Sequence, residues 1–202
     1  MSKYSNSTNY PKFTTEEYSF KLQPKIDYSK KFLPSALLKT GVEYVKLVQS
    51  AKECGVYNES SDKKIWLEAI EFLFEAFAFG VWQAASYIYK WYSINQQQEN
   101  AKIFAKVAEH FDSNINISYE APQYLKPTIQ KCIEFVESNS AIYSSKKKVT
   151  FFELEKQLVL FQKQTGLFTE HYNLPPIEEI ELLQKDAKII GDDNCFSGCN
   201  IF

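Results

Sequence analysis

Two cysteines near the end of the chain are the residues whose type and spacing most clearly suggest chemistry. Cys199 stands fourth from the end and is followed by Asn200, the aliphatic Ile201 and a final Phe202. Protein prenyltransferases modify a cysteine in this C-a-a-X position, and a final Phe favours a geranylgeranyl group. Cys195 lies four residues upstream, where a reversible acyl chain could be added. The sequence therefore predicts a lipid on Cys199 and offers Cys195 for a second chain.

The composition of the tail bears on how stable such an anchor would be. A single lipid chain gives only marginal, reversible membrane binding, at about 0.8 kcal/mol per buried CH₂. The tail contains no polybasic cluster, and it carries acidic residues: Glu178, Glu179, Glu181, Asp192 and Asp193. Stable anchoring would therefore depend on Cys195. The alternative is a frayed C-terminus with two incidental thiols.

Prenylation also predicts where the protein acts. The enzymes that read this motif are eukaryotic, so the chain would come from a eukaryote or be delivered by a bacterium into a eukaryotic host. We expect it at the cytoplasmic face of a membrane, through the lipid anchor, and otherwise in the cytoplasm.

Three carboxylates are the next candidates for chemistry. Glu68, Glu71 and Glu75 follow one another at three- and four-residue steps, so they share one face of a helix. Such a row could bind a metal or perform acid–base chemistry, which makes a helical enzyme one alternative. No histidine accompanies them, and a solvated stripe is the favoured interpretation. The chain contains no phosphate-binding loop or nucleophile elbow. We predict no catalytic residue, metal or cofactor.

An aromatic cluster lies just after these carboxylates in the chain. Its members are Trp82, Tyr87, Tyr89, Trp91 and Tyr92. Packing in the core is the favoured use for most of them. The alternative is a peptide-binding groove of the kind found on concave faces of helical repeats. In that case Trp82, Tyr89, Trp91 and Tyr92 would be the partner-binding residues.

Composition limits the classes of protein to be considered. The chain has 202 residues, of which 16% are aromatic and 24% charged, as in a globular protein. A net charge of −2 gives no overall reason to expect nucleic acid binding, and the lysines at 146–148 are predicted to lie in a solvated loop. No secretory signal or membrane-spanning run occurs. In a reducing compartment, Cys54 and Cys132 would pack as small hydrophobic residues.

Helical periodicity dominates the centre of the chain, and it predicts an all-α fold of six or seven antiparallel helices. We expect an extended arm over residues 1–34, a helical domain over 35–170, and a linker, short helix and tail over 171–202. The predicted helices cover residues 36–55, 62–80, 84–93, 98–111, 123–138, 151–164 and 177–188. Ser35 and Thr150 are predicted as N-caps, Asp62 as a helix start, and Gly55 and Gly80 as helix ends.

An alanine–phenylalanine–alanine pattern occurs twice, 32 residues apart. The two copies are Ala69, Phe72 and Ala76, and Ala101, Phe104 and Ala108. Together with Ala84 and Tyr87, residues 62–112 resemble Sel1-like repeats, which are relatives of tetratricopeptide repeats. The match departs from that family where Ile88 and Tyr89 replace a glycine and where Asp112 replaces a closing glycine. The resemblance implies a short solenoid of helix pairs, and the alternative is a generic antiparallel bundle.

Taken together, these features predict a non-enzymatic adaptor or effector. The helices would bind a protein partner, and the C-terminus would be a substrate of a prenyltransferase. This layout is similar to that of bacterial effectors delivered into eukaryotic hosts. A structural subunit of a larger complex is another alternative, because the N-terminal arm is rich in aromatic residues.

Overall fold

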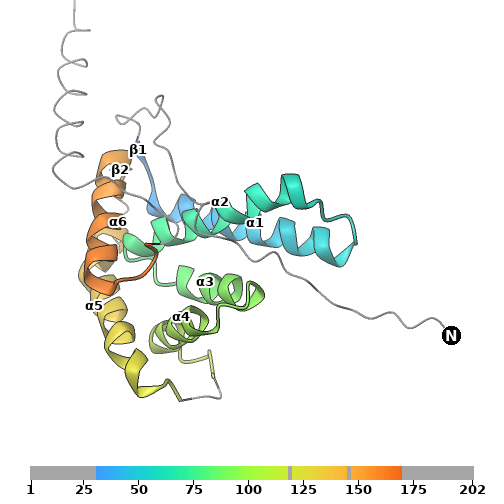
Figure 1. Cartoon of the computed structure of the whole chain (residues 1–202). Coiled ribbons are helices and arrows are strands. Elements are labelled where there is room, and N and C mark those ends of the chain that lie inside the picture. The colour runs from blue at the N-terminus through green and yellow to red at the C-terminus, as the bar shows by residue number, and fades with distance from the viewer. Residues whose placement is uncertain (1–30, 118–119, 145–146, 170–202) are drawn as a thin grey trace, which may run out of the picture.

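The computed structural model describes residues 31–117, 120–144 and 147–169, and this part of the chain is mainly α-helical, as predicted (Figure 1). The elements in chain order are β1 (Lys31–Phe32), α1 (Pro34–Glu53), α2 (Glu59–Ala78), α3 (Ala84–Ile94), α4 (Gln98–Phe111), the 3₁₀ helix η2 (Gln123–Leu125), α5 (Lys126–Ser144), β2 (Val149–Thr150) and α6 (Phe151–Thr165). The predicted arm up to residue 30, the helix at 177–188 and the two tail cysteines lie outside the described residues.

The first helix begins earlier than predicted. Pro34 occupies its first turn, and Leu33 before it is extended and provides no side-chain cap. The proposed cap at Ser35 is therefore wrong, because Ser35 is already inside the helix. Proline is well suited to a first helical turn, since its fixed φ is helical and its missing N–H would have no partner there.

The start of α2 also differs from the prediction. The N-cap is Asn58, whose Oδ1 accepts a hydrogen bond from the backbone N–H of Ser60 at 3.0 Å. Asp62 lies in the first turn, and its Oδ2 accepts a hydrogen bond from the N–H of Asn58 at 2.6 Å. Asp62 was predicted as the start of this helix, but the helix begins three residues before it, at Glu59.

Two helix ends were predicted correctly from their glycines. Gly55 follows α1 with a φ of +69°, and Gly80 follows α2 with a φ of +79°. At the end of α1, the N–H of Gly55 donates to the carbonyl of Lys52 and the N–H of Val56 donates to that of Ala51. These two bonds form a Schellman motif, which satisfies carbonyls that the helix leaves free.

Gly80 has a second role, because it lets α5 approach the end of α2. A Cβ atom at this position would lie 2.6 Å from the backbone carbon of Asn139 on α5. Gly41 provides a similar approach between α1 and α2, where a Cβ would lie 2.9 Å from the Leu73 side chain. The glycines thus fix where the helices cross.

The remaining helices overlap their predicted ranges, but α5 begins three residues later than predicted, because Gln123–Leu125 form the 3₁₀ helix, and it ends six residues later. The prediction for α4 has the observed bounds, and Thr150 caps α6 as expected. The N–H of Glu153 donates to Thr150 Oγ1 at 3.2 Å, and the N–H of Thr150 donates to Glu153 Oε2 at 2.7 Å. The strands were missed. They pair antiparallel, with Lys31 opposite Thr150 and Phe32 opposite Val149, and two residues are too few to show a strand period.

The core is built around α2. This helix packs along α1 and against α3, α5 and α6, while α3 pairs with α4. Phe74 and Phe77 are fully buried and both contact the rings of Phe104 on α4 and Phe161 on α6. Figure 1 shows α5 and α6 at one end of the α1–α2 pair, and the turn between α1 and α2 at the other.

None of the described helices is both long enough and apolar enough to cross a membrane.

Candidate functional site

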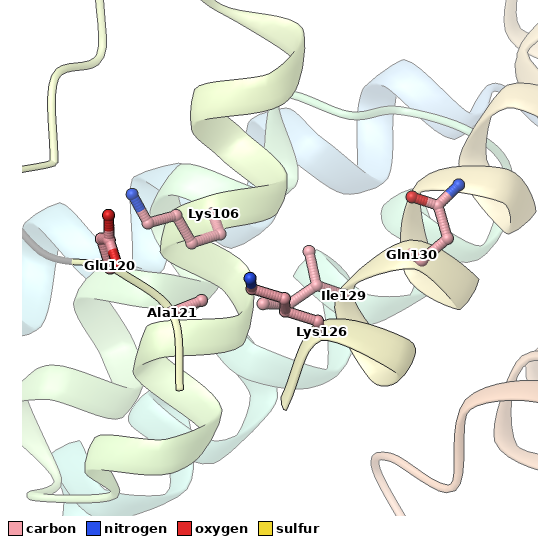
Figure 2. A pocket seen from close by; sticks show the side chains of 6 residues that line it. All are labelled: Lys106, Glu120, Ala121, Lys126, Ile129 and Gln130. Carbon is pink, nitrogen blue, oxygen red and sulfur yellow. The ribbon is translucent and has the colours of Figure 1, made fainter. Parts of the chain in front are cut away.

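A hollow of about 450 Å³ opens between α4, the connection that follows it and the first turns of α5 (Figure 2). Its lining residues are Lys106, Glu120, Ala121, Lys126, Ile129 and Gln130. The size lies within the range of about 300–1,000 Å³ that is usual for small-molecule sites. The sequence did not point to this region, because these residues share no motif and come from three segments.

One wall of the hollow is held in place by a pair of charged side chains on α4. Lys106 Nζ donates to Glu109 Oε2 at 2.7 Å and to the carbonyl of Ile117 at 3.3 Å. Glu109 Oε1 in turn accepts from the N–H of Ile117 at 3.3 Å. The hydrogen bond from Lys106, helped by that from Ile117, lowers the pKa of Glu109. The two side chains therefore bind the backbone N–H and carbonyl of Ile117 and hold this loop residue against α4.

A surface hydrogen bond also joins α4 to the segment that leads into α5. Tyr124 in η2 donates its hydroxyl hydrogen to Glu99 Oε1 at the start of α4, at 2.6 Å. This bond, followed by desolvation and then by the negative charge of Glu99, raises the pKa of Tyr124. The bond therefore connects η2, which directly precedes α5, to the first turn of α4.

The lining of the hollow is chemically mixed. In Figure 2 the amine of Lys106 and the carboxylate of Glu120 lie on the same side, with Ile129 and Lys126 on α5 across from them. Gln130 already donates to Glu134 on its own helix at 2.9 Å. The hollow can accept a small polar group or a side chain of a partner, but its lining residues do not form a nucleophile–base pair of the kind that catalysis needs.

Two of the predicted partner-binding aromatics belong to the core. Trp91 is 0% exposed and Tyr92 is 1% exposed, so neither ring is accessible to a partner. Trp91 stacks on Trp66 of α2, with ring centroids 5.7 Å apart, and its Nε1 donates to the carbonyl of Trp66 at 2.8 Å. Tyr92 stacks on Phe104 at 5.9 Å. The favoured interpretation, packing in the core, is confirmed for these two residues, and their assignment to partner binding is wrong.

Trp82 and Tyr89 are half-buried, and for them a role in binding stays a prediction. Trp82 precedes α3 and stacks on Phe111 at the end of α4, with the centroids 6.0 Å apart. Trp82 lies outside α3 and Tyr89 lies at the edge of its buried face, so helical periodicity alone did not separate these two from the inner aromatics.

A lysine lies against the aromatic residues at the turn between α1 and α2. Lys52 Nζ is 5.0 Å from the centroid of the Tyr57 ring and 5.1 Å from that of Trp66. Burial lowers the pKa of Lys52. The contact is a cation–π interaction that holds the turn against α2.

The three carboxylates of α2 are all half-buried, and Glu68 pairs with Lys64 at 3.6 Å. Burial, and then the nearby charge of Glu68, raises the pKa of Glu71 to about 7. None of the three lines the hollow at α4 or a smaller one beside α6. Among the described residues, no cluster of His, Cys, Asp and Glu could hold a metal ion.

A fourth carboxylate was missed by the sequence. Glu155 on α6 is only 8% exposed, and its Oε2 has no hydrogen-bond partner in the described structure. Burial raises the pKa of Glu155 to about 7. Its position beside apolar residues in the helix could have indicated that Glu155 is buried. Leu154, Leu158 and Val159 are buried with it.

The remaining candidates are cysteines and histidines. Cys132 is buried as predicted, and burial raises the pKa of its thiol. The same prediction is wrong for Cys54, which is exposed just beyond the end of α1. His110 Nε2 lies 3.5 Å from Glu137 Oε1 on α5. His171, Cys195 and Cys199 lie outside the described residues.

Comparisons with protein family models, with curated proteins and with solved structures returned no match. The proposals that follow therefore depend on the residues of this chain alone.

Proposed function

We propose that the protein is a non-enzymatic adaptor or effector. Its helical body binds a protein partner, and a prenyl group on Cys199 holds it at the cytoplasmic face of a eukaryotic membrane. An acyl chain on Cys195 would make the anchor stable. The observation that carries the proposal is the sequence Cys199-Asn200-Ile201-Phe202. The reaction requires that Phe202 be the last residue when the prenyltransferase acts.

The helical body supports the interaction role. The pairs α1–α2 and α3–α4 pack as antiparallel hairpins, and α3 packs on α2. This order is the one expected where helix hairpins stack, as in Sel1-like and tetratricopeptide repeats. The contacts of α5 and α6 with α2 depart from an open stack, because they cover one of its sides. Trp82 and Tyr89 are the aromatic residues through which a partner could be bound.

Fractionation of eukaryotic cells tests the anchor. The full chain should be found with membranes, Cys199→Ser should move to the soluble fraction, and Cys195→Ser should be divided between the two. Cys54→Ser is the matched control, because it removes an exposed thiol from the folded body. It should behave like the unchanged chain. Membrane association of Cys199→Ser equal to that of the unchanged chain would overturn the proposal.

A further inference from the structure

Lysines far apart in the sequence meet where β1 pairs with β2. Lys31 lies directly opposite Thr150 in the two-stranded ribbon, and Lys147 and Lys148 lead into β2. All three lysines are exposed, whereas Val149, between Lys148 and Thr150, is 1% exposed. Lys147 and Lys148, which the sequence predicted to lie in a solvated loop, are therefore part of a larger basic surface, and Lys146 lies outside the described residues.

A small hollow of about 130 Å³ lies beside this ribbon. Its lining residues are Phe79, Lys147, Val149, Glu153, Lys156, Gln157 and Leu160. Lys147 comes from the segment before β2 and Lys156 from α6. The hollow is too small for a drug-sized ligand, whose sites measure about 300–1,000 Å³, but it has room for a small anionic group.

Glu153 is the acidic residue in this lining, and its carboxylate already has partners. It accepts hydrogen bonds from the N–H and the hydroxyl of Thr150 at 2.7 and 3.1 Å, and it lies 3.5 Å from Lys147 Nζ. Although burial acts to raise it, the pKa of Glu153 is lowered by these hydrogen bonds and by Lys147. Because Lys147 is 60% exposed, that ion pair is a weak surface pair, and the lysine can turn to an external anion.

We propose that Lys31, Lys147, Lys148 and Lys156 form a surface for anionic phospholipids, with a headgroup phosphate or carboxylate held between Lys147 and Lys156. Each lysine that approaches an anionic bilayer strengthens binding roughly fivefold. The patch deepens the proposed membrane anchoring, since a single prenyl chain needs a second signal and the tail has no basic cluster. The site itself does not require the lipid on Cys199.

The surface suits a membrane better than a nucleic acid. All 23 basic residues of the chain are lysines, so it has no arginine for bidentate contacts with bases or phosphates. The net charge of −2 also means that the attraction is confined to the patch. A bilayer needs only one such patch, because it presents many headgroups in one plane.

Vesicle sedimentation with unlipidated protein tests this site by itself. The full chain would carry Cys195→Ser and Cys199→Ser and be mixed with phosphatidylcholine vesicles, with or without phosphatidylserine. We expect binding only when phosphatidylserine is present, and less of it at high salt. Adding Lys147→Gln and Lys148→Gln should weaken binding roughly tenfold or more. The matched control is Lys46→Gln with Lys131→Gln, which removes the same charge from exposed positions on α1 and α5 and should keep most of the binding.

Three results would overturn the inference. The first is equal binding, or none, to the two kinds of vesicle. The second is an equal loss in the control variant, which would mean that net charge alone matters. The third is binding to a DNA duplex that is tighter than binding to phosphatidylserine vesicles and is abolished by Lys147→Gln and Lys148→Gln. That result would assign the patch to nucleic acid. None of these results depends on whether Cys199 is prenylated, so this test and the fractionation test fail separately.

Discussion

The helices α2 and α4 carry the same alanine–phenylalanine–alanine pattern in different surroundings. The alanines behave alike in both copies, since Ala69 and Ala76 are 0% exposed and Ala101 and Ala108 are 2% and 1% exposed. The phenylalanines differ. Phe104 is fully buried, whereas Phe72 is half-buried against Tyr44 of α1, 5.8 Å away.

The difference follows from which side of each helix its neighbours cover and not from their number, because the more exposed phenylalanine belongs to the helix with more neighbours. α2 packs on four other helices, and α4 packs mainly on α3 and α5. The same offset of 32 residues aligns Glu71 with Ile103, which is 3% exposed. The two segments therefore share buried small residues, while the burial of the large and charged positions follows the local surroundings. The repeated pattern predicts that its alanines are buried and does not predict the burial of the other positions.

Truncating the two phenylalanines gives the largest expected effect. Phe104→Ala should destabilise the protein by about 3–5 kcal/mol, because it removes a ring that contacts Phe74, Phe77 and Tyr92 in the core. Phe72→Ala should cost only about 1–2 kcal/mol, since that ring is partly in water. Urea unfolding followed by circular dichroism measures both. Equal losses would mean that the two copies are equivalent after all.

The two glycines that follow α1 and α2 should differ next in their effect on stability. Gly80→Ala should cost about 2–4 kcal/mol, because its φ of +79° strains alanine and the new Cβ would meet the backbone of Asn139. Gly55→Ala is the matched control. Its φ of +69° is similar, but a Cβ there would have no neighbour within 4 Å, so it should cost about 1–2 kcal/mol. A similar loss at both glycines in the same unfolding experiment would exclude the close contact with α5.

Glu71 of α2, which aligns with Ile103 of α4, should make the stability of the protein depend on pH. The pKa of Glu71 is raised from 4.5 to about 7 in the folded protein, so the folded state binds more protons than the unfolded state between these values. Stability should therefore fall by up to about 3 kcal/mol as pH rises from 4.5 through 7. Glu71→Gln should remove this loss and be more stable, relative to the unchanged chain, at pH 8 than at pH 5.

Glu153→Gln is the control of opposite sign. The pKa of Glu153 is lowered on folding, so its contribution is present above the unfolded value of about 4.5 and is lost as pH falls through the lowered one. The penalty for Glu153→Gln should therefore be larger at pH 7 than at pH 3. Parallel pH profiles for the two variants would show that the assigned environments are wrong.

The smallest effect is expected at the junction before α4. Gln96 follows α3 with a φ of +59°, in the position that glycine occupies after α1 and α2. Gln96→Gly should relieve this strain and stabilise the protein by roughly 0.5–1 kcal/mol. The stabilisation should appear as a higher midpoint of thermal unfolding. A lower midpoint would mean that the Gln96 side chain stabilises the fold by more than the backbone strain destabilises it.

Local signals in the sequence predicted much of the fold. Thr150, Gly55 and Gly80 marked helix ends correctly, because capping depends on the nearest few residues. The pairing of Lys31 with Thr150 could not be predicted, since it joins segments more than a hundred positions apart through two-residue strands. Periodicity also could not decide that Trp91 is buried and Trp82 only half-buried, because Trp82 lies before α3 and outside its helical pattern.

The candidate site was harder to predict than the fold. The hollow at α4 depends on the clamp of Lys106 and Glu109 on the backbone of Ile117, and no sequence pattern marks a backbone acceptor. Glu155 shows the same limit. A charged residue in a helix is expected to be exposed, and only the packing of the folded chain shows that its carboxyl is buried.

Intact mass measurement of the protein from eukaryotic cells tests the lipid anchor most directly. We predict the added mass of one geranylgeranyl group on the peptide that contains Cys199. The Cys199→Ser variant should show no added geranylgeranyl mass. Removal of the three residues after Cys199 should accompany the modification. An unmodified Cys199 in a chain that ends at Phe202, from cells in which a known C-a-a-X protein is fully prenylated, would contradict this prediction.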